Sequence, residues 1–266
     1  MYYANENIKL YYEIIGEGHP LLILHGFSID HRGVKGIVEE SIDPNKYQRI
    51  YIDLPGMGQS PTPTKMINAD DLVTSLLEFL DFLIGNQSFS LLGYSYGGYL
   101  CLGMMKKLSN QVKSLVLLAP VIKANSADRT LPEKPSKQLH SFEIANNPIF
   151  DQYKHSVVNV TEEGYERYIN EIYCGLNIGD HDFQKSFQES GYSLSFEKSL
   201  LANAIECDSL IILGAQDMTV GFQDILNYRS MFSKGSFIII ETAGHNLQID
   251  ERKQVKEQLK RFWVVD

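Results

Sequence analysis

The chain has 266 residues, of which 44% are hydrophobic and 21% charged, a globular composition long enough for one large α/β domain or a core with an insertion. The formal net charge of −9 argues against a nucleic-acid partner and against binding to anionic membranes. No stretch reaches the roughly 18 apolar residues of a membrane-spanning helix, and residues 1–7 lack the basic start and apolar run of a secretory signal. The 3 cysteines have no paired spacing, which predicts reduced thiols in a cytoplasmic protein.

Strand-like and helix-like patterns alternate along residues 1–120. Residues 8–14 alternate with period two and end at a glycine-rich turn, which predicts an antiparallel hairpin strand at a sheet edge. Short apolar runs of the interior-strand kind follow at 20–24, 47–52, 88–92 and 112–119. Helices are predicted at 70–84, from an apolar stripe with helical spacing, and at 98–105. The alternation predicts a mainly parallel sheet with helices on both faces.

Residues 121–206 break this alternation, since they hold few strand-like runs and several polar loops. We interpret them as a helical lid inserted into an α/β core that comprises residues 1–120 and 207–266. Within the second part of that core, strands are expected at 209–214 and 236–240, and a closing helix at 250–262.

The predicted lid is rich in aromatic and acidic side chains. Its aromatic residues are expected to pack helices onto the core, with some facing a pocket: Phe142, Phe150, Tyr153, Tyr165, Tyr168, Tyr173, Phe183, Phe187, Tyr192 and Phe196. Its glutamates are expected on solvated helix faces, with the binding of a substrate amine as the alternative: Glu143, Glu162, Glu163, Glu166 and Glu171.

A serine flanked by glycines stands between the predicted strand at 88–92 and the predicted helix at 98–105. Residues 93–97 read GYSYG, with Ser95 at the centre. A strand, a sharp turn of the G-x-S-x-G type and a helix form a nucleophile elbow, in which the serine adopts a strained backbone and its hydroxyl projects above the sheet. The helix N-terminus also points its free amides at the group that the serine attacks. Ser95 is therefore the predicted nucleophile.

A serine hydroxyl needs a base to accept its proton and an acid to orient that base. His245 follows the last predicted strand in a flexible turn and is the candidate base, while Asp217 follows the preceding strand and is the candidate acid. All three residues lie just past the C-terminal end of a predicted strand, where open parallel sheets place their ligand sites. The chain order of serine, aspartate and histidine is that of the α/β-hydrolase class.

Two other residues compete for these roles. His25 is the rival base, but within a His-Gly-Phe turn a structural part is favoured. Asp224 is the rival acid, and its position at the start of a predicted helix favours a solvated or capping carboxylate.

Acyl transfer also needs donors for the developing oxyanion. The backbone amide of Tyr96, in the first turn of the elbow helix, is one candidate. The amide of Phe27, which follows the strand at 20–24, is the second.

These motifs resemble those of the α/β-hydrolase superfamily, in its lid-bearing, esterase- and lipase-like branch. The matching segments lie in family order along nearly the whole chain: residues 25–27 (HGF), 53–60 (DLPGMGQS), 93–97 (GYSYG), 214–217 (GAQD) and 244–245 (GH). The resemblance implies that the loop at 53–60 shapes a turn beside the pocket. A serine at the elbow counts against the dehalogenases and epoxide hydrolases of this superfamily, which carry aspartate there.

The sequence thus predicts a serine hydrolase that cleaves a small to medium carboxylic ester or related acyl compound through an acyl-enzyme. The alternatives are a carbon–carbon bond hydrolase or an acyltransferase on the same residues, or a ligand receptor that keeps the hydrolase fold. We expect a small-molecule acyl substrate, no cofactor and no metal, because the histidines lack paired spacing and no phosphate-binding glycine motif is present. The oligomeric state, the acyl-chain preference and the physiological substrate are left open.

Overall fold

A computed structural model of the protein describes residues 1–65, 67–133, 139–200 and 202–264. Within them, eight strands form one sheet in the order β1-β2-β4-β3-β5-β6-β9-β10. The pairs β1–β2 and β2–β4 are antiparallel and the other neighbours are parallel. The strands are β1 (Tyr2–Ala4), β2 (Lys9–Ile15), β3 (His19–Leu24), β4 (Tyr47–Ile52), β5 (Phe89–Tyr94), β6 (Val112–Leu118), β9 (Asp208–Gly214) and β10 (Gly235–Ile240).

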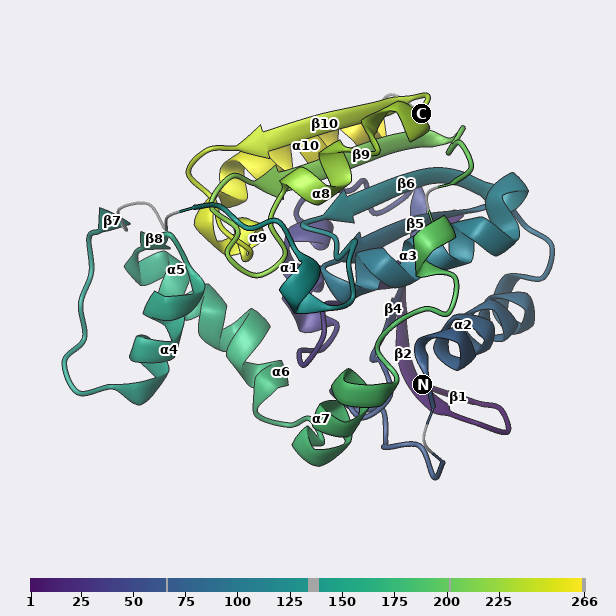
Figure 1. Ribbon diagram of the computed structural model, residues 1–266, viewed down its shortest axis with the longest axis horizontal. Helices are drawn as coiled ribbons and strands as arrows, with labels where there is room; N and C mark the ends of the chain where they lie inside the picture. Colours follow the sequence, from purple (N-terminus) through teal and green to yellow (C-terminus); the bar gives the residue numbers. More distant parts are fainter. Residues whose placement is uncertain (66, 134–138, 201, 265–266) are drawn as a thin grey trace.

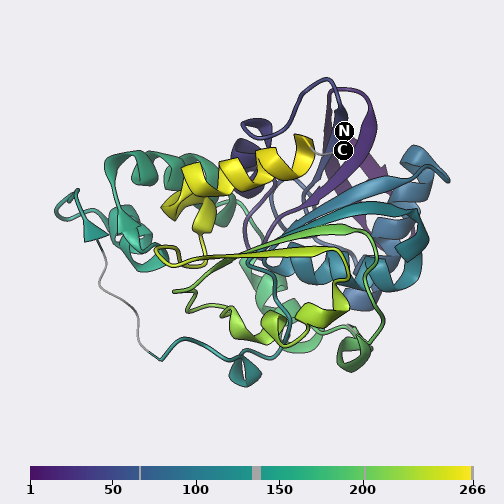
Figure 2. The ribbon, with the colours of Figure 1, turned by 90° about the horizontal axis from the view of Figure 1, so that it is seen from above.

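Helices cover both faces of this sheet. Figure 2 shows α10 on one face and α3 and α8 on the other. The predicted fold class, a mainly parallel sheet with helices on both sides, is confirmed. The α-helices are α1 (Arg32–Glu39), α2 (Ala69–Ile84), α3 (Tyr96–Leu108), α4 (Pro148–Ser156), α5 (Glu162–Arg167), α6 (Cys174–Leu176), α7 (His181–Ser190), α8 (Gln223–Leu226), α9 (Leu247–Asp250) and α10 (Arg252–Val264).

The interior strands explain why their sequence is apolar without alternation. All six residues of β5 are buried, as are the last five of β3 and of β6, because helices cover the sheet on both sides. The predicted bounds of β4 match the structure, and those of the other interior strands differ by one or two residues at their ends.

The N-terminal hairpin differs from the prediction. β2 is antiparallel to its neighbours, as expected, but its hairpin partner is β1, which precedes it in the chain. The glycine-rich turn at 16–18 leads instead to β3, which lies beyond β4 in the sheet. Gly18 has a φ of 110°, so the turn needs glycine for its backbone conformation rather than for a hairpin.

The helix ends follow local signals. Asn68 accepts a hydrogen bond from the amide of Asp71, whose side chain accepts one in return, so a capping box starts α2. The predicted closing helix at 250–262 corresponds to α10, which begins two residues later because Glu251, with a φ of −133° and a ψ of 48°, is not helical and separates α10 from the short α9. Helix α1 was not among the predicted helices.

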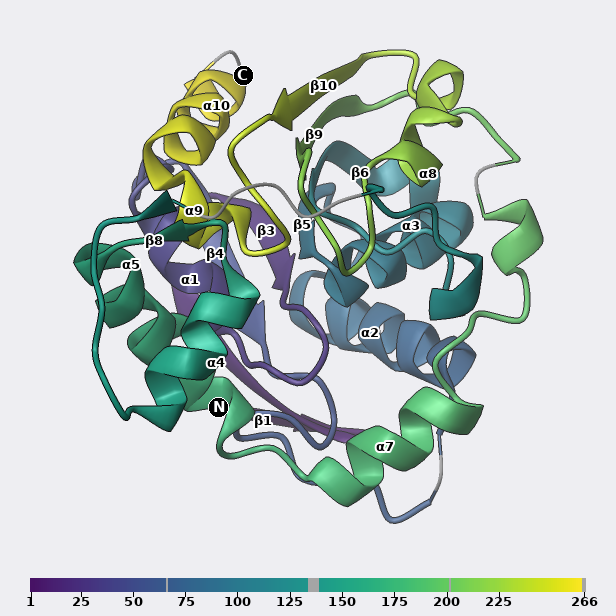
Figure 3. The ribbon, with the colours of Figure 1, turned by 60° about the vertical axis from the view of Figure 1, so that its left-hand side comes forward.

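The helices α4–α7 all come from residues 121–206. They lie near the C-terminal ends of the strands, which the arrowheads of β6 and β10 mark in Figure 1. Figure 3 shows α4 and α5 beside α9, with α7 farther along the molecule. A short parallel ribbon of β7 (Leu139–His140) and β8 (Asn159–Val160) also belongs to this segment. The division into core and lid stays a prediction, and residues 66, 134–138, 201 and 265–266 of its ranges lie outside the described residues.

Candidate active site

Ser95 occupies the sharp turn between β5 and α3. Its φ of 54° lies in the left-handed region, which costs a residue with a side chain of order 1–3 kcal/mol. The turn is held from both sides, because the amide of Ser95 donates to the carbonyl of Leu118 at 2.9 Å and its carbonyl accepts from Val121 at 3.0 Å. Strain that the surrounding structure maintains is typical of functional sites.

The two glycines of the motif allow the strand and the helix to pass closely. A Cβ atom on Gly93 would lie 2.5 Å from the carbonyl oxygen of Gly97. A Cβ atom on Gly97 would collide with the carbonyl oxygen of Leu24 in β3. The spacing of the motif is therefore a packing requirement of this elbow.

Ser95, His245 and Asp217 form one hydrogen-bonded series. The Nε2 atom of His245 lies 3.0 Å from Oγ of Ser95, and its Nδ1 atom lies 2.8 Å from Oδ2 of Asp217. A carboxylate only accepts hydrogen bonds, so Nδ1 carries the proton and the lone pair of Nε2 faces the serine hydroxyl. The three residues come from the ends of β5, β9 and β10, which the fold brings to one edge of the sheet.

Asp217 is fully buried, and its second oxygen is also occupied. Oδ1 accepts hydrogen bonds from the amides of Thr219 at 2.8 Å and Val220 at 2.9 Å. These donors compensate the buried charge and fix the carboxylate in the orientation that meets His245.

The rival acid Asp224 has other partners. It forms an ion pair with Lys123 at 2.7 Å and accepts hydrogen bonds from the amide and hydroxyl of Thr130. It lies in the first turn of α8, as the sequence suggested, but it is only 3% exposed, so the prediction of a solvated carboxylate was wrong. The reason is that the segment around Thr130 folds over it.

The rival base His25 is fully buried with both ring nitrogens engaged. Its Nε2 atom accepts from the amide of Leu54 at 2.9 Å, so Nδ1 carries the proton and donates to the carbonyl of Gly26 at 2.6 Å. Burial lowers the pKa of His25, which keeps the ring neutral. This ring therefore joins the loop after β3 to the loop after β4.

The loop that His25 holds lies against the serine. A Cβ atom on Gly26 would come within 3.2 Å of Cβ of Ser95. Phe27 follows directly, and Ser28 has a φ of 67°, which turns the chain sharply at this point. Tyr96 begins α3, where the first backbone amides have no partner within the helix. Both predicted oxyanion donors thus belong to segments that adjoin Ser95.

The side chains of these two residues meet aromatic residues of the predicted lid. The ring of Tyr96 stacks on that of Tyr192, with ring centroids 4.1 Å apart. The ring of Phe27 stacks on that of Phe187, with ring centroids 6.0 Å apart. We call Phe27, Tyr96, Tyr99, Phe187 and Tyr192 the aromatic cluster. It packs the segment around α7 onto the elbow, with stacked and edge-on pairs of the kind that add about 0.5–1.5 kcal/mol each.

A second group of aromatic residues of the predicted lid lies around α4 and α5. Phe150 contacts Phe142, Tyr153 and Tyr165 with centroids 5.1–5.8 Å apart. These rings contact one another rather than the aromatic cluster. Phe187 and Tyr192 contact Phe27 and Tyr96 directly, and Phe183 contacts Phe187 from the same helix, with ring centroids 5.8 Å apart.

A small apolar cavity adjoins the aromatic cluster. Its volume is about 10 Å³, about enough for one water molecule. The lining residues come from the loop after β4, from α2 and α7, and from the elbow: Leu54, Pro55, Met57, Ile67, Leu72, Tyr96, Phe183 and Phe187.

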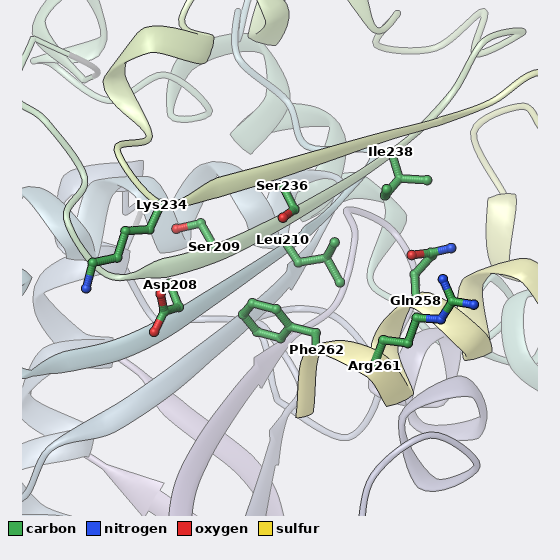
Figure 4. A pocket seen from close by; sticks show the side chains of 9 residues that line it. All are labelled: Asp208, Ser209, Leu210, Lys234, Ser236, Ile238, Gln258, Arg261 and Phe262. Carbon is green, nitrogen blue, oxygen red and sulfur yellow. The ribbon is translucent and has the colours of Figure 1, made fainter. Parts of the chain in front are cut away.

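A larger groove of about 410 Å³ lies at the opposite end of the sheet. It is formed by the first residues of β9 and β10 together with α10 (Figure 4). The groove is lined by Asp208, Ser209, Leu210, Lys234, Ser236, Ile238, Gln258, Arg261 and Phe262. Since Ser95 and Asp217 follow the C-terminal ends of their strands, this groove is separate from the candidate active site.

Asp30, His31 and Asp53 are the one group in the described part of the chain whose ligand atoms lie close enough to hold a metal ion, within 4.8 Å of one another. Their hydrogen-bonding capacity is already used. Asp53 accepts from Nδ1 of His31 at 2.7 Å and from the amide of Gln59 at 2.8 Å, while Asp30 pairs with Arg32. The cluster therefore fits the turn-shaping part that the loop at 53–60 was expected to play.

Four of the five glutamates of the predicted lid are exposed, as expected (Glu143, Glu162, Glu163 and Glu166), and Glu171 is the exception. The side chain of Glu171, in the π-helical stretch Tyr168–Tyr173, is only 12% exposed and forms an ion pair with Arg252 at 2.9 Å. Glu143 pairs with Lys154, and Glu163 with Arg167. For Glu171 the expected solvated face was wrong, because the stretch packs against α1 and α10. Its carboxylate already has a cation partner, which disfavours the alternative of a substrate amine.

Sequence reasoning missed the residues that hold the His245 loop. The carboxylate of Asp250 accepts from the amides of Gly244, Val158 and Asn159, and burial raises its pKa to about 6. Asn246 accepts from the hydroxyl of Tyr94 at 2.8 Å. The available signal was a carboxylate at the end of the short buried run 247–250, where an unpaired charge is costly.

Two further observations bear on the chain as a whole. No helix within the described residues combines the length and hydropathy needed to cross a membrane. The three cysteines, Cys101, Cys174 and Cys207, are free thiols.

Comparison with known proteins gives consistent matches. A family model described as alpha/beta hydrolase fold matches residues 19–252. A solved alpha/beta superfamily hydrolase from Oenococcus oeni PSU-1 is 31% identical, with a TM-score of 0.90 over 98% of this chain and 97% of that one. AB hydrolase superfamily protein YisY of Bacillus subtilis is 22% identical over 97% of both chains. Putative esterase/lipase 2 of Mycoplasma pneumoniae is 22% identical over 86% of this chain and 82% of its own.

Proposed function

Because the chain belongs to the α/β-hydrolase fold family, we propose that it is a serine hydrolase that cleaves small to medium carboxylic esters through an acyl-enzyme. The observation that carries the proposal is the series from Ser95 through His245 to Asp217, with hydrogen bonds of 3.0 and 2.8 Å. The similarity to a putative esterase/lipase supports the same class of reaction.

In the acylation step, Oγ of Ser95 attacks the carbonyl carbon of the ester while Nε2 of His245 takes the hydroxyl proton. The carbonyl oxygen becomes an oxyanion and accepts hydrogen bonds from the amides of Phe27 and Tyr96. His245 then gives its proton to the leaving alkoxide oxygen, so an alcohol departs and Ser95 carries the acyl group.

In the deacylation step, His245 takes a proton from water, and the resulting hydroxide attacks the acyl carbon. The tetrahedral intermediate collapses with release of the carboxylic acid, and the proton returns to Ser95. Asp217 stays ionised throughout, holds the productive tautomer of His245 and stabilises its charged form.

The surroundings favour an uncharged acyl group. The aromatic cluster forms an apolar wall beside Ser95, and the cavity that adjoins Tyr96 and Phe187 has a volume of about 10 Å³. Burying an ionic group against such a wall without a partner is unfavourable. The proposed substrates are therefore esters whose acyl part is neutral and short.

Hydrolysis of p-nitrophenyl esters from acetate to octanoate tests the proposal. We expect turnover that is highest on the shortest esters and is lost by a factor of about 10⁶ in Ser95→Ala. Ser90→Ala is the matched control, because Ser90 is a buried serine of β5, the strand before Ser95, and forms a hydrogen bond with Ser114. Equal turnover in the wild type and in Ser95→Ala would refute the proposal. Release of an alcohol and an acid in equal amounts distinguishes hydrolysis from acyl transfer.

A further inference from the structure

Asp250 ends α9, five residues after His245 in the chain, and its carboxylate is nearly fully buried. Its two oxygens serve two different segments. Oδ2 accepts from the amide of Gly244, directly before His245, at 2.9 Å. Oδ1 accepts from the amides of Val158 at 2.7 Å and Asn159 at 2.9 Å, at the start of β8.

This carboxylate is compensated by backbone donors. Within the described residues its partners are the three amides, and no cation forms an ion pair with it. A buried anion needs such donors, and hydrogen bonds to a charged acceptor are stronger than neutral ones. Losing either set of donors would leave the charge under-compensated. The position of the segment at 158–159 and that of the His245 loop therefore depend on the same carboxylate.

Other side chains join the same two segments. The Nδ2 atom of Asn159 donates to the carbonyl of Thr242 at 3.0 Å and to that of Asp250 at 3.2 Å. On the other side of the loop, Nδ2 of Asn246 donates to the carbonyl of Ser156 at 2.9 Å. Residues 156–159 thus contact the loop both before and after His245.

We propose that Asp250 is a positioning residue that couples the docking of the segment at 156–159, between α4 and β8, to the placement of His245. When that segment is docked, the three amides hold the carboxylate, and the carboxylate holds Gly244. When the segment leaves, two of the three donors are lost and the loop gains freedom to move His245 out of line with Ser95. Measuring this coupling through ester turnover rests on the proposed function, because it requires that the protein hydrolyses esters.

The direct test compares Asp250→Asn, Asn159→Ala and the double variant at pH 8, where Asp250 is ionised because its pKa is about 6. An asparagine amide donates as well as accepts, so it cannot serve donors on both sides as the carboxylate does. We expect Asp250→Asn to lower kcat about tenfold with little change in KM, and Asn159→Ala to lower it severalfold. The fold-reduction in kcat of the double variant should be smaller than the product of the two single fold-reductions, because both changes break the same coupling.

The matched control is Glu39→Gln, which removes a carboxylate that binds Arg49 and the hydroxyl of Tyr51 at the far end of α1. It should lower thermal stability and leave kcat unchanged. The proposal is overturned if Asp250→Asn and Asn159→Ala also lower thermal stability and leave kcat unchanged, because Asp250 is then merely structural. It is overturned as well if the fold-reductions in kcat of the two single variants multiply in the double variant.

Hydrogen exchange separates this proposal from the proposed function. In Asp250→Asn, peptides covering residues 156–160 and 242–246 should lose protection together, whereas Glu39→Gln should leave both protected. If the wild type hydrolyses no ester but the two peptides lose protection together in Asp250→Asn, the proposed function fails and the coupling stands. If only one of the two peptides opens, the coupling fails whatever the turnover.

Discussion

The Oδ2 atom of Asp217 lies 2.8 Å from Nδ1 of His245, while its Oδ1 atom is held by two backbone amides. Both oxygens of the carboxylate are therefore held in place, and only the tautomer of His245 that is protonated at Nδ1 can donate a hydrogen bond to Oδ2. This relationship sets which nitrogen of His245 is free to accept the proton of Ser95.

Asp217→Asn tests the role of this acid. The asparagine side chain is the same size, but its amide favours the wrong tautomer of His245, so we expect kcat to fall about 10⁴-fold with the fold intact. Steady-state kinetics on p-nitrophenyl acetate measure the loss. Asp224→Asn is the control, since Asp224 binds Lys123 and Thr130 instead, and it should change kcat by no more than a few-fold. A larger loss of kcat in Asp224→Asn than in Asp217→Asn would assign the role of the acid to Asp224.

Phe187→Ala tests whether the aromatic cluster limits the acyl group. Removing this ring joins its volume to the cavity beside Tyr96, so we expect the preference to move from acetate toward butyrate and hexanoate esters by about tenfold in kcat/KM. Phe150→Ala controls for lost stability, because Phe150 is a fully buried ring of the other aromatic group, and each change costs about 3–5 kcal/mol. An unchanged chain-length profile in Phe187→Ala would show that the acyl group lies elsewhere.

The sheet was predictable from the sequence because its interior strands are buried on both faces and read as continuous apolar runs. The elbow was predictable because the close approach at Gly93 and Gly97 admits no side chain. The hairpin partner of β2 was not, since strand pairing depends on contacts between distant segments and the turn at 16–18 resembles a hairpin turn.

The candidate site shows the same division. Ser95, Asp217 and His245 each follow a recognisable strand, so their positions could be inferred from chain order. The partners of Asp250 could not, because two of its three donors are backbone amides some ninety residues away in the chain. Likewise, no sequence pattern separates Phe187, which meets Phe27, from Phe150, which packs within the lid segment.

His25→Ala tests the structural reading of the rival histidine. The substitution leaves the buried amide of Leu54 without an acceptor, which costs about 1–3 kcal/mol. We expect the free energy of unfolding in urea to fall by that amount, while covalent labelling of Ser95 persists at a reduced rate. Complete loss of labelling in a folded His25→Ala protein would instead point to His25 as the base.

Glu40→Gln tests the ion-pair network between Glu40, the residue directly after α1, and α10. Hydrogen bonds from Arg252 hold the pKa of Glu40 at about 2, below the ordinary value of 4.5. A carboxyl with a lowered pKa in the folded state stabilises the protein above pH 4.5, and this contribution is lost as the pH falls toward 2. The variant should therefore be less stable by about 1 kcal/mol at pH 7, because solvent screens a partly exposed pair. Urea unfolding between pH 2 and 7 should show the two curves converging at low pH, and a constant gap would contradict this assignment.

The most direct measurement is labelling with a fluorophosphonate, followed by intact mass and peptide mapping. The proposed mechanism predicts one adduct per chain, located on Ser95, that is absent in Ser95→Ala and strongly slowed in a variant in which His245 is replaced by alanine. Labelling that persists in Ser95→Ala, or a folded wild type that forms no adduct while hydrolysing no ester, would contradict the account.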